Sequence, residues 1–354
     1  MQHRIFQVLI IFLAPLIQAL LTASACQELL IPVPVNVPRY NINVTVKDDW
    51  DAAAVTSNLT RRDAGNITSP LPITGMTKEP VASEFIVGAT YCGNGSTVLI
   101  LSHGIIESKL YWHPNLKGAE KYSFVDAALK AGYSVLSYDR IGVGSSSEQV
   151  CLARIATNLL IGAVRIDGLK DAQFQVQTAV LDYITTHVRQ NMGAHKVALV
   201  GHSYGAYLSA ASANHSNVDS VVLTGFSGFF DHFAPFVAGA GLRVAKMHDP
   251  HRWGSLNSTF LTSSDLFAET YVYFKEPYFE HRIAKWTHEV ASEPFAVGDT
   301  GSGFAGTVRC FCLWRGARSI GVVNNLLAGH NLNLHKVAPD AFKIVFEFLK
   351  SQGV

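Results

Sequence analysis

The 354-residue chain has little charge, few cysteines and only one long apolar run. Charged residues make up 16% of it, with 28 Lys and Arg against 27 Asp and Glu, whereas 48% of the residues are hydrophobic. This composition excludes a disordered chain, because there is ample apolar surface to bury. No basic run exceeds Arg61-Arg62, so we expect no nucleic-acid partner, which would need a basic stripe. Five cysteines are too few for a disulfide scaffold, so the core must come from packing.

The one long apolar run lies near the N-terminus, over residues 5–21. Arg4 precedes it, and the small residues Ala23-Ser24-Ala25 follow it. This order predicts a secretory signal peptide over residues 1–25. A membrane anchor is the less favoured alternative, because the run is short for spanning and is interrupted by Pro and Gln. We therefore expect a secreted, extracellular protein with no stable membrane insertion.

Glycosylation sequons and cysteines fit the same compartment. Six N-x-S/T sequons suggest passage through a glycosylating secretory pathway; they lie at Asn43, Asn58, Asn66, Asn94, Asn214 and Asn257. The five cysteines allow at most two bridges, and our predicted bridge joins Cys26 to Cys92. Cys310 and Cys312 would point to the same side of a strand and are poorly placed to bridge each other. Burial as free thiols is as good an interpretation of that pair.

The composition and the hydrophobic pattern divide the rest of the chain into four regions. Residues 26–82 are rich in Pro and predict an extended, glycosylated lead-in with an edge strand. Over 83–227 and again over 298–354, apolar runs alternate with helical patterns, which predicts a parallel sheet covered on both faces. Residues 228–297 are rich in aromatics and predict an inserted helical cap, with outer helices of the sheet as the alternative. The apolar runs lie at 97–104, 134–140, 196–205, 218–227 and 307–314, and the helical patterns at 124–133, 168–190, 206–213 and 339–352.

The sequence Gly201-His202-Ser203-Tyr204-Gly205 has the pattern G-x-S-x-G between an apolar run and a helix of small residues. Flanking glycines in that setting permit a sharp turn that lifts a serine hydroxyl clear of the sheet. The pattern predicts Ser203 as a nucleophile, with a structural serine as the alternative. Its oxyanion would be held by the N–H of Tyr204, next to the nucleophile, and by the N–H of Ile105 after His103-Gly104. A plain glycine turn is the other interpretation of His103-Gly104.

Over about residues 83–354, the chain resembles the α/β-hydrolase superfamily. The resemblance is carried by HG at 103–104, DRIGVGSS at 139–146, GHSYG at 201–205 and GHNLNLHKVAPDAFKIVFEFL at 329–349. More narrowly, YSFVDAALKAGYSVLSYDRIGVGSSS and VVLTGFS are similar to secreted fungal serine hydrolases of the esterase or lipase type. The resemblance implies an α/β-hydrolase fold, with a mostly parallel sheet, helices on both faces and an inserted cap. It also implies cleavage of a small-molecule carboxylic ester or lipid, with no cofactor and no metal.

The resemblance implies a histidine base late in the chain and an acid before it. His330 follows a glycine as that pattern requires, so we favour it as the base over His335. No Asp or Glu occurs between Thr300 and Pro339, so the triad acid is unknown. A true deletion and an error in the gene model both explain the absence of an acidic residue there. Asp231 and Asp299 are candidates for the triad acid by their position in the chain only.

The missing acid has a functional consequence. Loss of the acid costs a serine triad on the order of 10⁴ in turnover, so we expect weak activity. The alternative is a catalytically inactive hydrolase-fold binding protein. An epoxide hydrolase or dehalogenase is disfavoured, because the similar enzymes of those types carry Asp where this chain has Ser203. Asp139-Arg140 is predicted to brace the loops around the site and not to do chemistry.

Overall fold

The computed structural model describes residues 26–60, 71–146, 150–155, 158–163, 165–228, 233–300 and 321–354, with backbone alone for the two strands between 150 and 163. Four sequence predictions lie outside these residues: the signal peptide over 1–25, the sequon at Asn66, the candidate acid Asp231, and the strand at 307–314 that carries Cys310 and Cys312.

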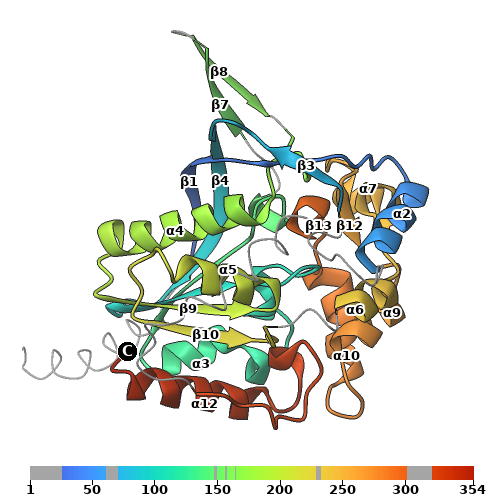
Figure 1. The fold of residues 1–354 in the computed structure, drawn as a ribbon. Coiled ribbons are helices and arrows are strands. Elements are labelled where there is room, and N and C mark those ends of the chain that lie inside the picture. The colour runs from blue at the N-terminus through green and yellow to red at the C-terminus, as the bar shows by residue number, and fades with distance from the viewer. Residues whose placement is uncertain are drawn as a thin grey trace, which may run out of the picture.

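A six-stranded sheet forms the centre of the molecule, in the order β1-β4-β6-β5-β9-β10 (Figure 1). The strands β6, β5, β9 and β10 are parallel neighbours, whereas β1 and β4 run antiparallel at one edge. The mostly parallel sheet confirms the predicted fold class. The strands are β1 (Gln27–Val37), β4 (Val81–Cys92), β5 (Thr97–Ser102), β6 (Ser134–Tyr138), β9 (Lys196–His202) and β10 (Ser220–Thr224).

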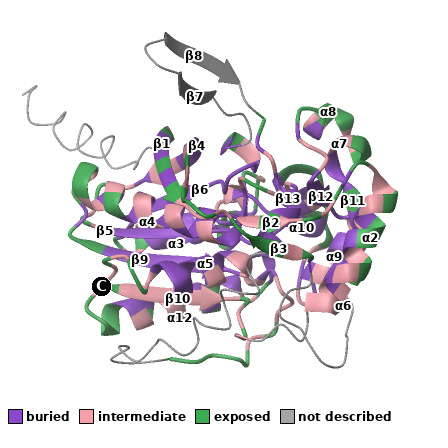
Figure 2. Cartoon of the chain, turned by 45° about the horizontal axis from the view of Figure 1, so that its top comes forward, coloured by how far each residue is buried: buried purple, intermediate pink, exposed green. Residues whose placement is uncertain are grey.

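Helices cover both faces of this sheet. The side chains of β5 alternate, so Val98 and Ile100 pack in one apolar cluster and Leu99 and Leu101 in the other. The first cluster includes residues of α4 (Phe174–Asn191) and α5 (Tyr204–Ser212), and the second includes residues of α3 (Phe124–Lys130) and α12 (Ala338–Ser351). The central strands are accordingly the most buried part of the molecule (Figure 2). None of the described helices is long and apolar enough to cross a membrane.

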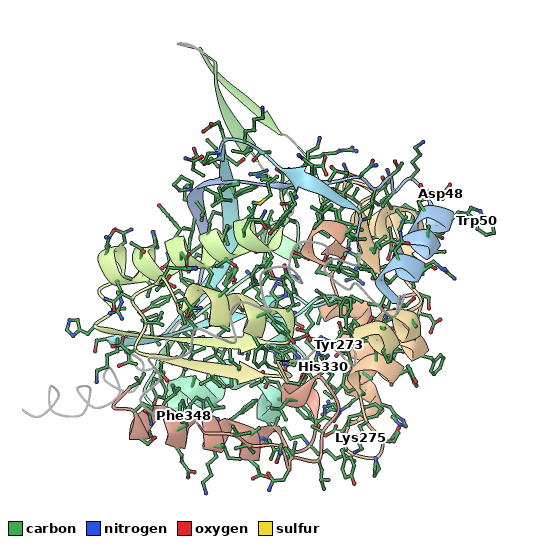
Figure 3. All side chains as sticks on the ribbon, in the orientation of Figure 1. Asp48, Trp50, Tyr273, Lys275, His330 and Phe348 are labelled. Carbon is green, nitrogen blue, oxygen red and sulfur yellow. A yellow bond between two sulfur atoms is a disulfide. The ribbon has the colours of Figure 1, made fainter. Side chains whose placement is uncertain are left out.

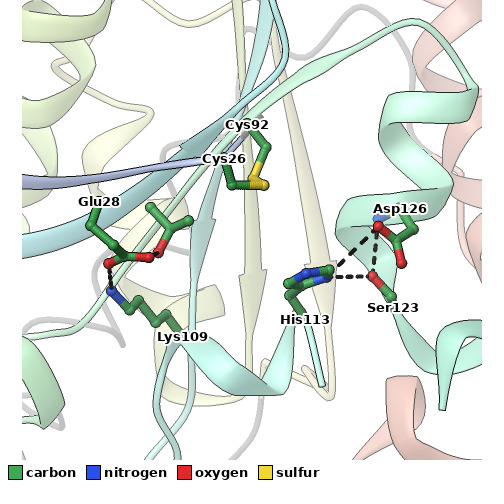
Figure 4. Close-up of a disulfide and its surroundings, with 8 residues drawn as sticks. Cys26, Glu28, Cys92, Lys109, His113, Ser123 and Asp126 are labelled. Carbon is green, nitrogen blue, oxygen red and sulfur yellow. Dashed lines mark hydrogen bonds and ion pairs between the residues drawn. A yellow bond between two sulfur atoms is a disulfide. The ribbon is translucent and has the colours of Figure 1, made fainter. Parts of the chain in front are cut away.

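The N-terminal region is more structured than a lead-in. Strand β1 pairs with β4 along its whole length, and the predicted disulfide between Cys26 and Cys92 joins the two strands (Figure 4). The alternation in β1 buries Val33 and leaves Pro32 and Pro34 exposed. The sequence did not reveal helix α2 (Asp49–Thr60), which packs against the cap, or the short pair β2 (Tyr40–Ile42) and β3 (Ile73–Met76).

The region predicted as a cap is largely helical, but it also holds a three-stranded sheet. That sheet consists of β11 (Arg243–Val244), β12 (Phe260–Thr262) and β13 (Phe295–Ala296). Strands of two or three residues are too short to show an alternating pattern, so they could not be predicted from the sequence. The helices are α6 (Phe233–Ala240), α7 (Ala245–His248), α8 (Pro250–Trp253), α9 (Leu266–Tyr273), α10 (His281–Trp286) and the π-helical turn η4 (Thr287–Ala291).

The remaining elements are short. The hairpin β7 (Val150–Ile155) and β8 (Asn158–Ala163) projects from one end of the molecule (Figure 1). Four 3₁₀ turns lie in loops: η1 (Lys109–Tyr111), η2 (Glu120–Tyr122), η3 (Gly144–Ser146) and η6 (Leu332–Leu334).

Candidate active site

Ser203 occupies a sharp turn between β9 and α5. Its backbone has φ +54° and ψ −120°, a strained conformation for a residue with a side chain. The turn is possible only because its flanking residues are glycines. A Cβ on Gly201 would lie 2.4 Å from the carbonyl oxygen of Gly205, and one on Gly205 would lie 2.1 Å from the carbonyl oxygen of Ser102. The structure therefore has the strand, tight turn and helix that the motif predicts.

His330 reaches this serine from a loop that precedes α12. Its Nε2 atom lies 2.7 Å from Oγ of Ser203, although the two residues are 127 positions apart. Burial lowers the pKa of His330 to about 4, so the ring is neutral at neutral pH and can accept the hydroxyl proton. The structure thus brings together the two residues predicted as nucleophile and base.

His335, the second candidate base, is occupied by backbone groups. Its Nδ1 atom donates to the carbonyl of Asn331 at 2.7 Å, and its Nε2 atom accepts the N–H of Gly329 at 2.9 Å and that of Lys275 at 3.2 Å. Gly329 and Asn331 flank His330 on the chain, so the ring of His335 clamps the loop on both sides of the candidate base. Both of its nitrogens are used, which leaves none to take a proton from Ser203.

The loop after β5 has the features of an oxyanion site. The carbonyl of Gly104 accepts hydrogen bonds from Nδ1 of His103 at 2.8 Å and from Nη2 of Arg140 at 3.2 Å. The N–H of Ile105 belongs to the same peptide and points the opposite way, because C=O and N–H are antiparallel in a trans peptide. Neither this N–H nor that of Tyr204 donates a hydrogen bond within the described residues. Among the described residues, both predicted donors therefore keep their hydrogen unused.

Backbone strain and close packing mark the same loop. Ile106 has φ +53°, which is rare for a β-branched residue and is tolerated where surrounding structure enforces it. A Cβ on Gly104 would lie 2.9 Å from Cβ of Ser203, so the loop passes directly against the nucleophile.

Asp299, a candidate for the triad acid by its position in the chain, pairs with Arg140 and not with His330. Its Oδ2 atom lies 2.9 Å from Nη1 of Arg140, and both side chains are at most 1% exposed. Its Oδ1 atom accepts a hydrogen bond from Gln177 at 3.3 Å. Asp299 is thus the counterion of Arg140, which in turn holds Gly104. Asp139 similarly accepts the N–H groups of Lys109 and Ser145, which agrees with a bracing role for Asp139-Arg140.

No carboxylate partner of His330 is recorded in the part of the chain that the structure describes. Its ring neighbours there are His202, whose centroid is 5.0 Å away, Tyr273 of α9, at 5.9 Å, and Phe236 of α6, at 6.0 Å. Figure 3 shows Tyr273 and His330 side by side between the sheet and the cap helices. Helices α6 and α9 therefore supply aromatic surface beside the candidate base.

Sequence reasoning missed one acidic residue at this site, Glu107. It is 3% exposed and its Oε2 atom accepts the N–H of Gly104 at 2.6 Å. It lies outside any motif, so no spacing pattern distinguishes it from a surface glutamate in a loop. Its carboxyl group lies against His202 of β9, almost a hundred residues away in the chain, and the local sequence does not encode that contact.

A serine and a histidine meeting at a strand-to-helix turn, above a mostly parallel sheet, define a hydrolase-like α/β protein. The profile of the alpha/beta hydrolase fold matches residues 97–288. This is more than half of the chain, and the chain therefore belongs to that family. No curated protein matches the sequence significantly.

Several solved structures are similar to this chain at low identity. A thermostable carboxyl esterase from Bacillus coagulans in complex with glycerol has 12% identity and a TM-score of 0.48, over 76% of this chain and 95% of its own. A lipase in its open form has 14% identity and a TM-score of 0.45 over the same shares, 76% and 95%. A bromoperoxidase from Bacillus anthracis has 23% identity and a TM-score of 0.29, over 42% of this chain and 41% of its own. This chain thus covers less than half the length of the bromoperoxidase.

Proposed function

We propose that the protein is a serine hydrolase that cleaves carboxylic esters or lipids through an acyl-enzyme on Ser203. The observation that carries this proposal is the 2.7 Å contact between Oγ of Ser203 and Nε2 of His330 at a strained turn. Structural serines rarely justify such strain, whereas a nucleophile benefits from an exposed, fixed hydroxyl. The resemblance of the sequence to secreted fungal esterases and lipases supports the same reaction class.

The proposed reaction proceeds in two halves. Ser203 Oγ attacks the ester carbonyl carbon while its proton passes to Nε2 of His330, and the carbonyl oxygen becomes an oxyanion. The N–H groups of Ile105 and Tyr204 bind that oxyanion. The intermediate collapses, the C–O bond to the alcohol breaks, and His330 returns the proton to the departing alcohol. Water then attacks the acyl-enzyme by the same route and restores Ser203.

A fluorophosphonate probe tests the nucleophile, because it labels only an activated serine. We expect labelling of the wild type that is lost in Ser203→Ala and kept in Ser57→Ala, since Ser57 is exposed on α2. Labelling that survives in Ser203→Ala contradicts the proposal. Without a triad acid, the turnover of short esters should be lower than that of a complete triad by a factor on the order of 10⁴. Turnover typical of complete esterases contradicts that expectation.

A binding protein on an inactive hydrolase fold is the second candidate. It is favoured by the lack of a carboxylate partner for His330 among the described residues. Folded wild-type protein that resists the probe would support this candidate. The transcript across the codons for residues 300–330 is a separate test. A longer reading frame with an Asp or Glu there would restore a triad.

The same proposal places the protein in the secretory pathway. The Cys26–Cys92 disulfide fits an oxidising compartment. Asn43, Asn94 and Asn214 are exposed, as an acceptor of N-linked glycan must be. Expression in a eukaryotic secretion host should give protein in the medium whose gel mobility rises after glycan removal. Replacement of the Asn of one exposed sequon by Gln should reduce that change in mobility. Protein that stays inside the cell and whose mobility does not change on glycan removal contradicts the proposal.

A further inference from the structure

Glu107 places a buried carboxyl group against the turn that carries Ser203. Its Oε2 atom accepts the N–H of Gly104 at 2.6 Å. A Cβ built on Gly104 would lie 2.8 Å from this oxygen and 2.9 Å from Cβ of Ser203. The carboxyl group and the nucleophile therefore pack around the same glycine, in the loop whose next N–H is the proposed oxyanion donor.

The other carboxyl oxygen faces His202, the residue immediately before the nucleophile. Oε1 of Glu107 lies 3.5 Å from Nε2 of His202, and the two side chains are at most 2% exposed. Neither atom makes a hydrogen bond of good geometry in the described part of the chain, and the side chain of Asn331 is a further hydrogen-bonding neighbour of His202. Two isolated buried polar atoms facing each other are costly unless they share a proton.

The surroundings of His202 determine which of its nitrogens carries hydrogen. Its Nδ1 atom lies 3.0 Å from Oγ1 of Thr224, and that hydroxyl donates to the carbonyl of Gly201. In the tautomer that satisfies both contacts, Nδ1–H of His202 donates to Thr224, and Nε2 carries a lone pair. Tyr111 stacks on the ring at 4.4 Å and fixes its plane.

In that tautomer, the hydrogen-bonding groups around Glu107 favour a protonated side chain. The N–H of Gly104 needs an acceptor, and the lone pair on Nε2 of His202 needs a donor. A neutral carboxylic acid supplies both, with its carbonyl oxygen toward Gly104 and its O–H toward His202. A carboxylate would leave two lone pairs opposed at Nε2.

Resting on the proposed hydrolase function, we infer that Glu107 is a positioning residue, held as a neutral carboxylic acid, that ties Gly104 of the oxyanion loop to His202 of the nucleophile turn. Ile105 and Tyr204, the two proposed oxyanion donors, directly follow Gly104 and Ser203. The Glu107 bridge therefore fixes the distance between the two donors. A neutral bridge also keeps negative charge away from the oxyanion that forms between them.

The charged groups around Glu107 fit this state. Burial raises the pKa of Glu107 to about 8, and the charge of Glu269 adds to that rise, while Arg140 and the hydrogen bond from Gly104 oppose it. The positive charge of Arg140 is already compensated by Asp299. The other titratable groups facing this region are neutral near pH 7, since burial lowers the pKa of the histidines and raises that of the tyrosines. They are His103, His202, His330, Tyr111 and Tyr273.

Replacement of Glu107 by Gln tests the inference, because a glutamine amide offers one acceptor and one donor without a titrating proton. We expect wild-type labelling by the fluorophosphonate probe, and ester turnover, to fall as pH rises through about 8. Glu107→Gln should keep the rate at pH 7 within roughly threefold and abolish that alkaline fall. Glu107→Leu, which has neither group, should lose about a hundredfold. Glu293→Gln is the matched control, since Glu293 is a buried glutamate of the cap, and it should keep the alkaline fall.

An infrared difference spectrum supplies a readout that needs no turnover. The wild type minus Glu107→Gln spectrum at pH 7 should contain the carbonyl stretch of a protonated carboxylic acid, and this band should vanish above pH 8. A carboxylate band at pH 7, or equal rate losses in the Gln and Leu variants, overturns the inference. Absence of probe labelling in the wild type overturns the proposed function instead, and the infrared band still decides the state of Glu107.

Discussion

The guanidinium of Arg140 meets the carboxylate of Asp299 at 2.9 Å in the interior, where both side chains are at most 1% exposed. Arg140 follows strand β6 of the core, and Asp299 follows β13 of the cap. The pair therefore connects the C-terminal end of the cap segment to the loop that holds Gly104. Its primary role is to keep the cationic brace of the oxyanion loop in place.

Removal of Asp299 should destabilise the fold. Asp299→Ala leaves Arg140 buried without a counterion, which typically costs about 3–5 kcal/mol of the free energy of unfolding. Glu347→Ala is the control, since Glu347 forms an exposed pair with Lys343, and it should cost about 0.5 kcal/mol or less. Denaturant unfolding measures both. If Asp299→Ala unfolds like the wild type but turns over on the order of 10⁴ more slowly, Asp299 is the triad acid after all.

His335 should prove necessary for the position of His330 and not for the chemistry itself. His335→Phe keeps a ring but removes the bonds to Gly329, Asn331 and Lys275, and a small displacement of the base can cost about a hundredfold in rate. Probe labelling of Ser203 should slow accordingly, while the midpoint temperature of thermal unfolding should fall only in part relative to the wild type. His251→Phe, at an exposed site, should label normally. A labelling rate in His335→Phe equal to wild type would show that the clamp is dispensable.

Activity should persist to unusually low pH. Only neutral His330 can accept the proton of Ser203, and burial lowers its pKa to about 4. The rate constant kcat/KM should thus stay level from neutral pH down to about 5 and fall as His330 is protonated near 4. A carboxylate on Nδ1 would raise that pKa and move the fall upward. A half-maximal rate near pH 6.5 would therefore reveal an acidic partner for the base.

The glycines of the turn should tolerate no side chain. A Cβ at position 205 would lie 2.1 Å from a backbone oxygen of β5, and neither backbone can yield without moving Ser203. We expect Gly205→Ala to lose both stability, by several kcal/mol, and probe labelling. At Gly321 the nearest atom would be 3.6 Å away, so Gly321→Ala should behave like the wild type. Equal behaviour of the two variants in thermal unfolding would contradict the steric argument.

The sequence predicted the sheet better than the elements around it. Strands β5, β6 and β9 are buried on both faces, so each is a nearly continuous apolar run bounded by turn residues, whereas β10 is half-buried. Helix α2 buries only Ala52, Val55 and Leu59, and three apolar residues in a Pro-rich region give a weak helical pattern. The small cap sheet depends on contacts between segments distant in the chain.

The same distinction applies to the site. Ser203 and His330 were identifiable because local glycines mark the turn and the loop that present them. Glu107 and the counterion role of Asp299 were not, since each depends on which charged group happens to be buried beside it. Motifs encode backbone geometry close in sequence, whereas electrostatic partners are set by the packing of distant segments.

The two exposed prolines of β1 have a consequence beyond this chain's own fold. A proline has no N–H, and within a sheet it sits where that group would face away from the neighbouring strand. Pro32 and Pro34 thus remove two donors from the outer margin of the sheet. A second molecule cannot add its own strand there in regular register, which protects a crowded, newly made protein from self-association along this margin.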